Sequence, residues 1–385
     1  MSMWLQLILV LPVMALSAAV LLRFAGRRAF PQNAYWRDMP LGVAFGHVLA
    51  AGMLGLAVKL YFIDRIVFFR WAVHGFGICA VAGYLFRAAG RHIGPAPLRK
   101  LFRQMPLTAA FGILTVLVYA FIAVFAGWLA PYGQAQIFEA VNVLPGTDPA
   151  HPLGTDQIGR DIFTRLIYGA QNTVGIAFVT TLIAFFLGGT LGFLAATIGG
   201  RFDQFLSRSV DVLMAIPALI FALLLMTIAS AWAGSERWLL TVYMVLIIAL
   251  IDSTRVFRLA RAVGSNIVVM DYIEAARLRG EGLAYLVFRE ILPNATAPLL
   301  AEFGLRFCFV FLTIAALSFL GIGIQPPLAD WGTMVKDLSQ FINFAAFSPL
   351  TAALPLMAAG AIALLTVAVN FIVDWMLQRS SGLKE

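Results

Sequence analysis

Long apolar runs separated by short charged segments make up most of the chain. The candidate helices are Trp4–Leu22, Leu41–Phe62, Ile66–Phe86, Leu107–Ala130, Thr173–Ile198, Val210–Ser230, Trp238–Thr254, Ala295–Leu320 and Leu350–Leu377. A helix needs about 17 to 25 apolar residues to cross the hydrocarbon core of a bilayer. The pattern therefore predicts an all-α, polytopic membrane protein, with Pro217 expected to kink the sixth helix.

Composition supports this prediction and excludes an ordinary soluble domain. Mean hydropathy is +0.90 and only 12% of the residues are charged, against about 25% in soluble proteins. A net charge of +8 fits Lys and Arg gathered on the cytoplasmic side of a membrane, so we expect no nucleic acid partner. Cys79 and Cys308 lie in apolar runs without the spacing of a metal site, and we expect neither a metal nor a cofactor in this chain.

Positive charge predicts the orientation of the helices. Basic residues follow the first run (Arg23, Arg27, Arg28, Arg37) and the third (Arg87, Arg91, Arg99, Lys100, Arg103). The positive-inside rule places both segments in the cytoplasm. We therefore expect the N-terminus outside and the C-terminus inside.

Two domains are expected from the order of these runs. Residues 1–105 would form an extension of about three transmembrane helices, and residues 106–385 a domain of six, with a cytoplasmic loop at 255–293. In the second domain, Gly188 and Gly192 have the G-x-x-x-G spacing that allows another helix to approach closely, and simple helix packing is their expected role.

The segment from Pro131 to about Gln171 is polar and is expected on the outer side. Its sequence HPLGTDQIGRD begins at His151, and Asp156 and Asp161 follow. These three residues could suggest metal ligands. Turn formation by the Pro and Gly residues among them is the favoured interpretation, because one His with scattered Asp residues is a weak metal signal.

The longest charged run in the chain is DYIEAARLRGEGLAYLVFREILP, from Asp271 to Pro293. Asp271 and Glu274 have the spacing of a capping box, with Asp271 as the N-cap. Gly280 and Gly282 are candidate helix stops. The predicted helix has about two turns and is too short to be stable alone in water. It would either dock into a groove of a partner protein or lie on lipid headgroups, and the pattern alone leaves both open.

Several motifs resemble one family of transporters. Glu274-Ala275-Ala276, Gly280 and Ile291-Leu292-Pro293 resemble the EAA loop of inner-membrane permeases of ABC importers. HPLGTDQIGRDIFTRLIYGAQ, ALSFLGIGIQPP from Ala316 and Asp330-Trp331-Gly332 resemble the dipeptide/oligopeptide/nickel branch, in particular its second permease subunit. The resemblance covers about residues 107–378. It implies a type I six-helix core, to which the three N-terminal helices are added.

The resemblance also implies a function and partners. The chain would form half of a translocation path for peptides, or for nickel, opines or other small solutes, in the inner membrane of a bacterium. Its partners would be a homologous permease, two ATP-binding subunits and a periplasmic or extracellular substrate-binding protein. Asp271, Glu274, Ala275, Ala276, Gly280, Ile291 and Pro293 would couple it to the ATPase, with Pro293 at the first position of the next helix.

Energy must then come from the partner subunits. The chain has no G-x-x-x-x-G-K-[ST] motif, so it cannot bind ATP through a P-loop of its own. A membrane-embedded enzyme is a rival prediction, but none of the four His residues forms an H-E-x-x-H pair. A channel is a second rival, and nothing in the chain resembles a selectivity filter. We expect a non-catalytic transport subunit.

Glu302 and Arg306 are four residues apart in the eighth predicted helix. Unpaired charge at membrane depth is costly, so the two are expected to pair. They could line the translocation path, or they could form a structural ion pair at a subunit interface, which is the favoured alternative.

Overall fold

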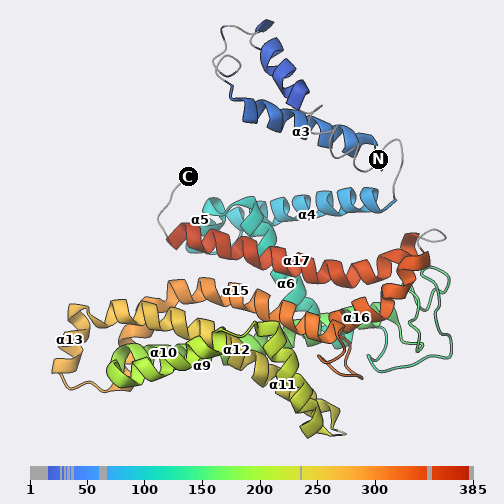
Figure 1. The fold of residues 1–385 in the computed structure, drawn as a ribbon. Coiled ribbons are helices and arrows are strands. Elements are labelled where there is room, and N and C mark those ends of the chain that lie inside the picture. Colours follow the sequence, from blue (N-terminus) through green and yellow to red (C-terminus); the bar gives the residue numbers. More distant parts are fainter. Residues whose placement is uncertain are drawn as a thin grey trace, which may run out of the picture. The chain divides into compact units, whose positions relative to one another are not determined.

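The computed structural model describes residues 16–26, 28–29, 32, 35, 39–59, 67–234, 236–344 and 349–380. Most of these residues are helical, as the sequence predicts, and in Figure 1 the helices α12, α15 and α17 run roughly parallel, whereas α6 and α11 run across them. The predicted helix Trp4–Leu22 lies mostly outside the described residues, which include a helical segment only from position 16 to 26. Two compact units are distinguished, Met1–Ile78 and Cys79–Glu385.

The first unit contains α3 (Leu41–Val58), and α4 (Val67–His92) continues from it into the second. Both helices lie where the sequence predicts apolar runs, although α4 extends six residues beyond Phe86. In the first unit, Ala19, Met39 and Ala44 form a small buried cluster. The boundary of the extension expected at residue 105 stays a prediction.

The second unit holds the remaining helices. They are α5 (Ala96–Gln104), α6 (Leu107–Val124), α7 (Ala126–Leu129), α8 (Ile162–Gly169), η2 (Ala170–Val174), α9 (Gly175–Ile198), α10 (Gly200–Met214), α11 (Ala218–Ala233), α12 (Arg237–Val268), α13 (Asp271–Leu278), α14 (Leu283–Tyr285), η3 (Leu286–Ile291), α15 (Leu292–Phe319), α16 (Trp331–Leu338), η4 (Ser339–Phe344) and α17 (Pro349–Ser380). Here η2 and η3 are π-helical turns and η4 is a 3-10 helix.

Six of the described helical segments are long and apolar enough to cross a membrane. Five of them, together with α10 and α11 as one broken span, supply the six-helix core that the sequence predicts. The kink predicted at Pro217 in Val210–Ser230 is confirmed, but the break is sharp enough to separate two helices, and the first of them begins at Gly200. The chain bends by 89° between α10 and α11, because Pro217 has no N–H to continue the helical ladder and becomes the residue before α11.

The helix predicted to begin at Thr173 begins eleven residues earlier, at Ile162. Asp161 caps it by accepting a hydrogen bond from the backbone N–H of Thr164. The polar residues of η2 continue the helix through a π turn, and Asn172 donates to the backbone O of Ala329 at 2.7 Å. Polar residues that read as a loop are thus buried inside the fold.

The α9–α12 pair is the most extensive helix contact of the second unit. A Cβ on Gly188 would overlap the backbone O of Ser253, and one on Gly192 would lie 2.7 Å from the backbone O of Phe257. The G-x-x-x-G pair therefore packs helix against helix, as the sequence predicts. Since no side chain separates these backbones, α9 and α12 form one rigid pair.

The main core lies between α6, α9, α12, α15, α16 and α17, around buried residues such as Phe311, Ile314 and Leu317. One end of the second unit carries α16 and the segment 131–161, and the opposite end carries α13, α5 and the last turn of α17 (Figure 1). We call them the α16 end and the α13 end.

Candidate functional site

The two-turn helix α13 joins two long helices, α12 and the continuous segment from α14 to α15. The capping box predicted at its start is absent. Met270 is the N-cap residue, in an extended conformation and without a side-chain capping bond. Its backbone O accepts from the N–H groups of Ile273 and Glu274 instead. Because the helix begins one residue before the predicted position, Asp271 and Glu274 both fall in its first turn, where negative charge favours the helix dipole.

Helix α13 ends at the predicted glycine. Gly280 has φ +82°, a left-handed conformation, and its N–H donates to the backbone O of Arg277. The N–H of Glu281 donates to the backbone O of Ala276. This is a Schellman motif, which ends the helix sharply and satisfies its last carbonyls. Gly282, with φ −77°, has an ordinary conformation and begins the next helix.

Two faces of α13 differ in burial. Ile273 and Ala276 are fully buried against residues of α9, α12 and η3, among them Phe193 and Ile291. The outward face carries Asp271, Tyr272, Glu274, Ala275 and Leu278. Leu278 is 83% exposed. The outward face thus combines two carboxylates with an apolar surface.

The sequence predicts that the helix after α13 begins at Pro293. In the structure this helix begins ten residues earlier, at Leu283. Pro293 lies inside the long helical segment, at the second position of α15, directly after the π-helical η3. A proline has no N–H to offer the preceding turn, and π-helical turns, although rare, occur mostly as single-turn bulges inside α-helices such as this one. Ile291 is buried in the core beneath α13, whereas Pro293 is exposed.

A second group of charges lies within the membrane-spanning part, on α12 and α15. Arg306 Nε is 2.6 Å from Glu302 Oε1, so the predicted pair is present. Arg306 Nη1 is 3.5 Å from Asp252 Oδ1, and Arg255 Nη1 is 3.8 Å from the same atom. We call Asp252, Arg255, Glu302 and Arg306 the charged cluster. It contains two positive and two negative groups, and it links α12 to α15.

Burial and an aromatic ring define the setting of this cluster. Asp252 and Arg306 are 5% and 8% exposed. The guanidinium carbon of Arg306 lies 4.6 Å from the centre of the Phe309 ring and that of Arg255 lies 5.8 Å from it, which is cation–π geometry. The Phe309 ring is itself half exposed. The cluster is therefore buried on one side and reaches the surface on the other.

Sequence reasoning missed Asp252. Its signal was available, since an Asp within the apolar run Trp238–Thr254 is costly without a partner. In the structure, Arg261 pairs with Asp203 of α10, and Arg255 belongs to the charged cluster.

At the α16 end, His151, Asp156 and Asp161 have a structural role. His151 Nδ1 is 2.9 Å from Asp161 Oδ1, and Asp156 Oδ2 is 2.7 Å from Arg160 Nε and 3.5 Å from Arg165 Nη1. Within the described part of the chain, no group of three or more His, Cys, Asp or Glu residues could hold a metal ion. The favoured turn interpretation agrees with the left-handed Gly154 and Gly159.

The Asp330-Trp331-Gly332 motif packs against the same region. Asp330 caps α16 by accepting from the N–H of Thr333 at 2.8 Å and from the hydroxyl of Thr173 at 3.1 Å. Trp331 Nε1 donates to the backbone O of Leu166 at 2.9 Å. Burial raises the pKa of the Asp330 carboxyl, against the lowering effect of these hydrogen bonds. The two motifs, about 170 residues apart in the sequence, therefore form one structure at the α16 end.

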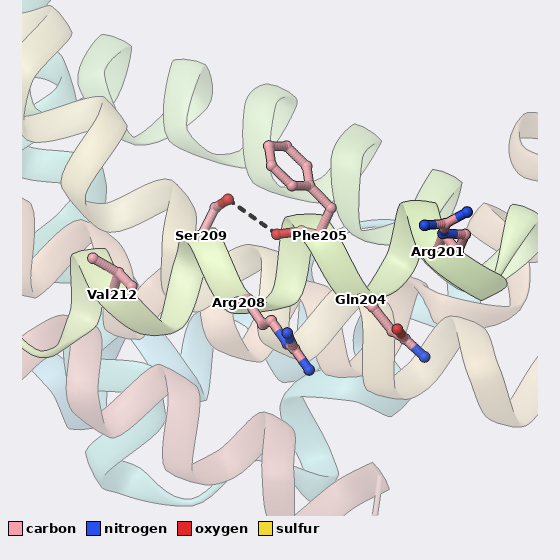
Figure 2. Close-up of a pocket in the computed structure, with 6 residues that line it drawn as sticks. All are labelled: Arg201, Gln204, Phe205, Arg208, Ser209 and Val212. Atoms are coloured by element: carbon pink, nitrogen blue, oxygen red, sulfur yellow. Dashed lines mark hydrogen bonds between the residues drawn. The ribbon is translucent and has the colours of Figure 1, made fainter.

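One shallow depression lies on α10. It is lined by Arg201, Gln204, Phe205, Arg208, Ser209 and Val212 (Figure 2). Ser209 donates to the backbone O of Phe205 at 3.0 Å, and the lining residues all come from this single helix. Because no second element encloses it, the depression is a face of α10 and does not form a substrate site by itself.

Comparison with protein families matches residues 188–381 to the family described as binding-protein-dependent transport system inner membrane component. The dipeptide transport system permease protein DppC of Escherichia coli K12 is 36% identical over 242 residues, which are 62% of this chain and 78% of that protein. The di/tripeptide permease protein DppC of Pseudomonas aeruginosa is 33% identical, over 65% of this chain and 82% of its own length. The peptide transport system permease protein SapC of Escherichia coli O6:H1 is 33% identical, over 73% of this chain and 92% of its own length.

Proposed function

The chain belongs to the family of binding-protein-dependent transport system inner membrane components, and from this premise we propose that it is one of two homologous permease subunits that enclose a path for peptides. The family consists of multi-pass inner membrane subunits of ABC importers, which work with ATPase subunits and a substrate-binding protein. The proposal adds a heterodimeric arrangement, two ATP-binding subunits, and an orientation with α13 and the C-terminus in the cytoplasm and the N-terminus outside.

Peptides are the proposed cargo because similar proteins are described as permeases for dipeptides, di/tripeptides and glutathione. Nickel, opines and other small solutes are the alternative. The ligand that co-purifies with the partner substrate-binding protein distinguishes these cargoes, because that protein selects the solute before it reaches the permease. Mass spectrometry of this material should find short peptides. A metal complex or an opine there would replace the peptide assignment without changing the transporter class.

The outward face of α13 is the proposed contact for the ATPase. Its carboxylates and the exposed Leu278 and Tyr272 offer charge and apolar area to a groove, in the helix-in-groove mode. Ala276 and Ile291 would support this contact indirectly, because they are packed in the buried core beneath α13. Gly280 allows the turn, and Pro293 lies in the helix that leads away. The single observation that carries this assignment is an exposed apolar helix face at the junction of two spanning helices.

Movement of α13 would reach the membrane through both of its neighbours. Helix α12 enters α13 within three residues, α15 follows it through η3, and the charged cluster ties α12 to α15 at membrane depth. The close α9–α12 contact adds α9 to the same body. Closure of the ATPase pair would therefore tilt α9, α12 and α15 together, which biases inward-facing against outward-facing states.

Gly280→Leu tests the coupling role, with Gly282→Leu as its matched control. Neither glycine has an atom near an added Cβ, so the two variants differ in backbone conformation alone. We expect Gly280→Leu to abolish peptide uptake, and transport-stimulated ATP hydrolysis, in a complex that still reaches the membrane. Gly282→Leu should retain most of both. Wild-type ATPase stimulation in Gly280→Leu would contradict the role of α13.

Glu302 and Arg306 are further proposed to border the translocation path, in a charged cluster that also includes Asp252 and Arg255. The half-exposed Phe309 ring and Arg255 give the cluster an open side, where a peptide terminus can approach. We expect Arg306→Leu to reduce uptake more than assembly.

A combined variant separates this role from a purely structural ion pair. Arg306→Leu leaves two acids, Asp252 and Glu302, with Arg255 as the one remaining cation of the cluster. A combined variant, Arg306→Leu with Glu302→Gln, leaves one acid and one cation and so removes the uncompensated charge. The path role predicts that the combined variant assembles normally and still fails to transport. Recovery of transport together with assembly would show that the cluster is structural.

A further inference from the structure

Helix α5 and its surroundings carry an uncompensated positive charge. Arg99, Lys100 and Arg103 lie on α5, and Arg87 and Arg91 lie in the last turns of α4. No Asp or Glu occurs in the sequence between Ile66 and Phe138. Within the residues that the structure describes, none of these five side chains takes part in an ion pair or a hydrogen bond.

The cationic face is held in a fixed position by the opposite face of α5. Phe102 and Met105 are buried in a small core with Ala109, Phe86 and Trp375. The Phe86 and Phe102 rings meet edge to face, with 5.3 Å between their centres. Gly90 makes this contact possible, because a Cβ there would overlap the Phe102 ring. Arg99, Lys100 and Arg103 are exposed on the other side of the helix.

The connections of α5 fix its depth. Residues 93–95 link it to α4 and residues 105–106 link it to α6, and both neighbours are long and apolar enough to span the membrane. Links of two and three residues reach about 10 Å at most. Helix α5 therefore cannot leave the membrane surface, and its exposed cations lie at the level of the lipid headgroups.

The end of α17 contributes to the same surface. Trp375 belongs to the core beneath α5, and the guanidinium carbon of Arg379 lies 6.0 Å from the centre of its ring. Figure 1 shows α5 and the last turns of α17 at one end of the second unit. Helix α17 also carries Asp374, whose carboxylate forms no ion pair with these cations. The surface therefore remains strongly positive.

We propose that α5, with Arg87 and Arg91 of α4 and Arg379 of α17, is a binding site for the phosphodiester headgroups of anionic phospholipids. Guanidinium groups match phosphate oxygens in charge and geometry, and clusters of four to eight Lys and Arg residues beside a spanning helix attract anionic lipids. Basic residues beside a spanning helix often serve only to set its orientation in the membrane. Here the fold also holds the cations in fixed positions, because the opposite face of α5 is packed in a core. Phosphatidylglycerol is the probe for this headgroup chemistry.

The test uses the complete permease–ATPase complex in a neutral detergent. A photoreactive phosphatidylglycerol is added, labelled peptides are mapped, and the experiment is repeated with a phosphatidylcholine of the same chains. Phosphatidylglycerol should label α5 and the ends of α4 and α17, and phosphatidylcholine should label them far less. The variant R99Q/K100Q/R103Q should lose labelling by about tenfold or more, since each cation near anionic lipid adds to binding.

The matched control is R201Q/R208Q, which removes two exposed cations from α10 and should leave labelling of α5 unchanged. Equal labelling by the two lipids would overturn the proposal, and so would unchanged labelling in the α5 variant. Cross-links from α5 to an ATPase subunit, in place of lipid, would also overturn it. Peptide uptake is not part of the readout, so failure here is distinguishable from failure of the proposed transport role.

Discussion

At the α16 end, a group of charged side chains is buried and paired within the chain, although Glu139 and Lys336 at the same end are exposed. Asp156 holds Arg160 and Arg165, Asp161 holds His151, and Asp330 is enclosed by hydrogen-bond donors. At the α13 end, the charged side chains of α13 and α5 are exposed. The two ends have similar sequence character, since both are polar interruptions between apolar helices.

The difference indicates what each end does. Charges that are neutralised inside the chain keep an irregular segment folded, and they offer little to a partner. Charges that remain at the surface cost nothing to the fold, and they are available for recognition. Polar segments of a membrane protein thus divide into structural and interacting ones according to where their charges are satisfied.

The largest effect is expected from Asp156→Ala at the α16 end. This change leaves the buried Arg165 without its carboxylate and leaves Arg160 with Asp337 alone, 3.5 Å away. It should lower the free energy of unfolding by about 3–5 kcal/mol. Thermal unfolding of the purified complex would measure it. Glu274→Ala at the α13 end should change stability by no more than about 0.5 kcal/mol. Similar losses in the two variants would break the comparison.

Ile273→Ala sharpens the comparison within the α13 end. Ile273 is fully buried beneath α13, so its truncation should cost about 2–5 kcal/mol by loss of apolar contact and formation of a cavity. The same unfolding measurement applies. Ala275→Gly on the outward face is the control, and it should lower the free energy of unfolding by about 1 kcal/mol because Gly is a poor helix former. A negligible effect of Ile273→Ala would mean that α13 is not supported by the core.

Asp330→Asn addresses the pH response of the α16 end. Because burial raises the pKa of Asp330 above its ordinary value of 3.8, the protonated carboxyl is favoured by folding. Its contribution to stability is complete below that ordinary value and is lost as the pH rises through the raised pKa. The stability of the unchanged protein relative to Asp330→Asn should therefore fall with rising pH. A difference that is independent of pH, or that increases, would contradict the shift.

The smallest effect on stability is expected from Leu278→Ser at the α13 end. This side chain is 83% exposed, so the free energy of unfolding should change by at most about 0.5 kcal/mol. Peptide uptake should nevertheless fall, because the apolar surface offered to the ATPase is removed. Leu283→Ser, at another exposed leucine just beyond α13, is the control. Full uptake in Leu278→Ser would argue against a docking role for that face.

Much of the fold can be predicted from the sequence, because each membrane-spanning helix requires a long run of apolar residues that is visible in the sequence. The G-x-x-x-G contact and the glycine stop of α13 were also predictable, since each depends on a property of glycine alone. Other features depend on contacts between distant residues. The start of the second spanning helix of the core at Ile162 relies on Asp161 as a cap and on Asn172 bonding to Ala329, 157 residues away. No local pattern contains that information.

The candidate site shows the same limit. The Glu302–Arg306 pair is local and was predicted, whereas Asp252 reaches Arg306 from another helix. The capping box failed because Met270, not Asp271, adopts the extended conformation that precedes α13. Sequence spacing cannot distinguish these two registers, since both leave the acids within the first turn.

The buried side of α13 has a consequence for how quickly a partner can engage. An isolated two-turn helix would have to fold during association, and ordering costs on the order of 1 kcal/mol per residue. Here Ile273 and Ala276 are fixed in the core of the chain, and a Schellman turn fixes the far end. The ordering cost is thus met within the permease itself, which leaves α13 preorganised. Association should then proceed as rigid docking, at a rate set by encounter and orientation rather than by folding.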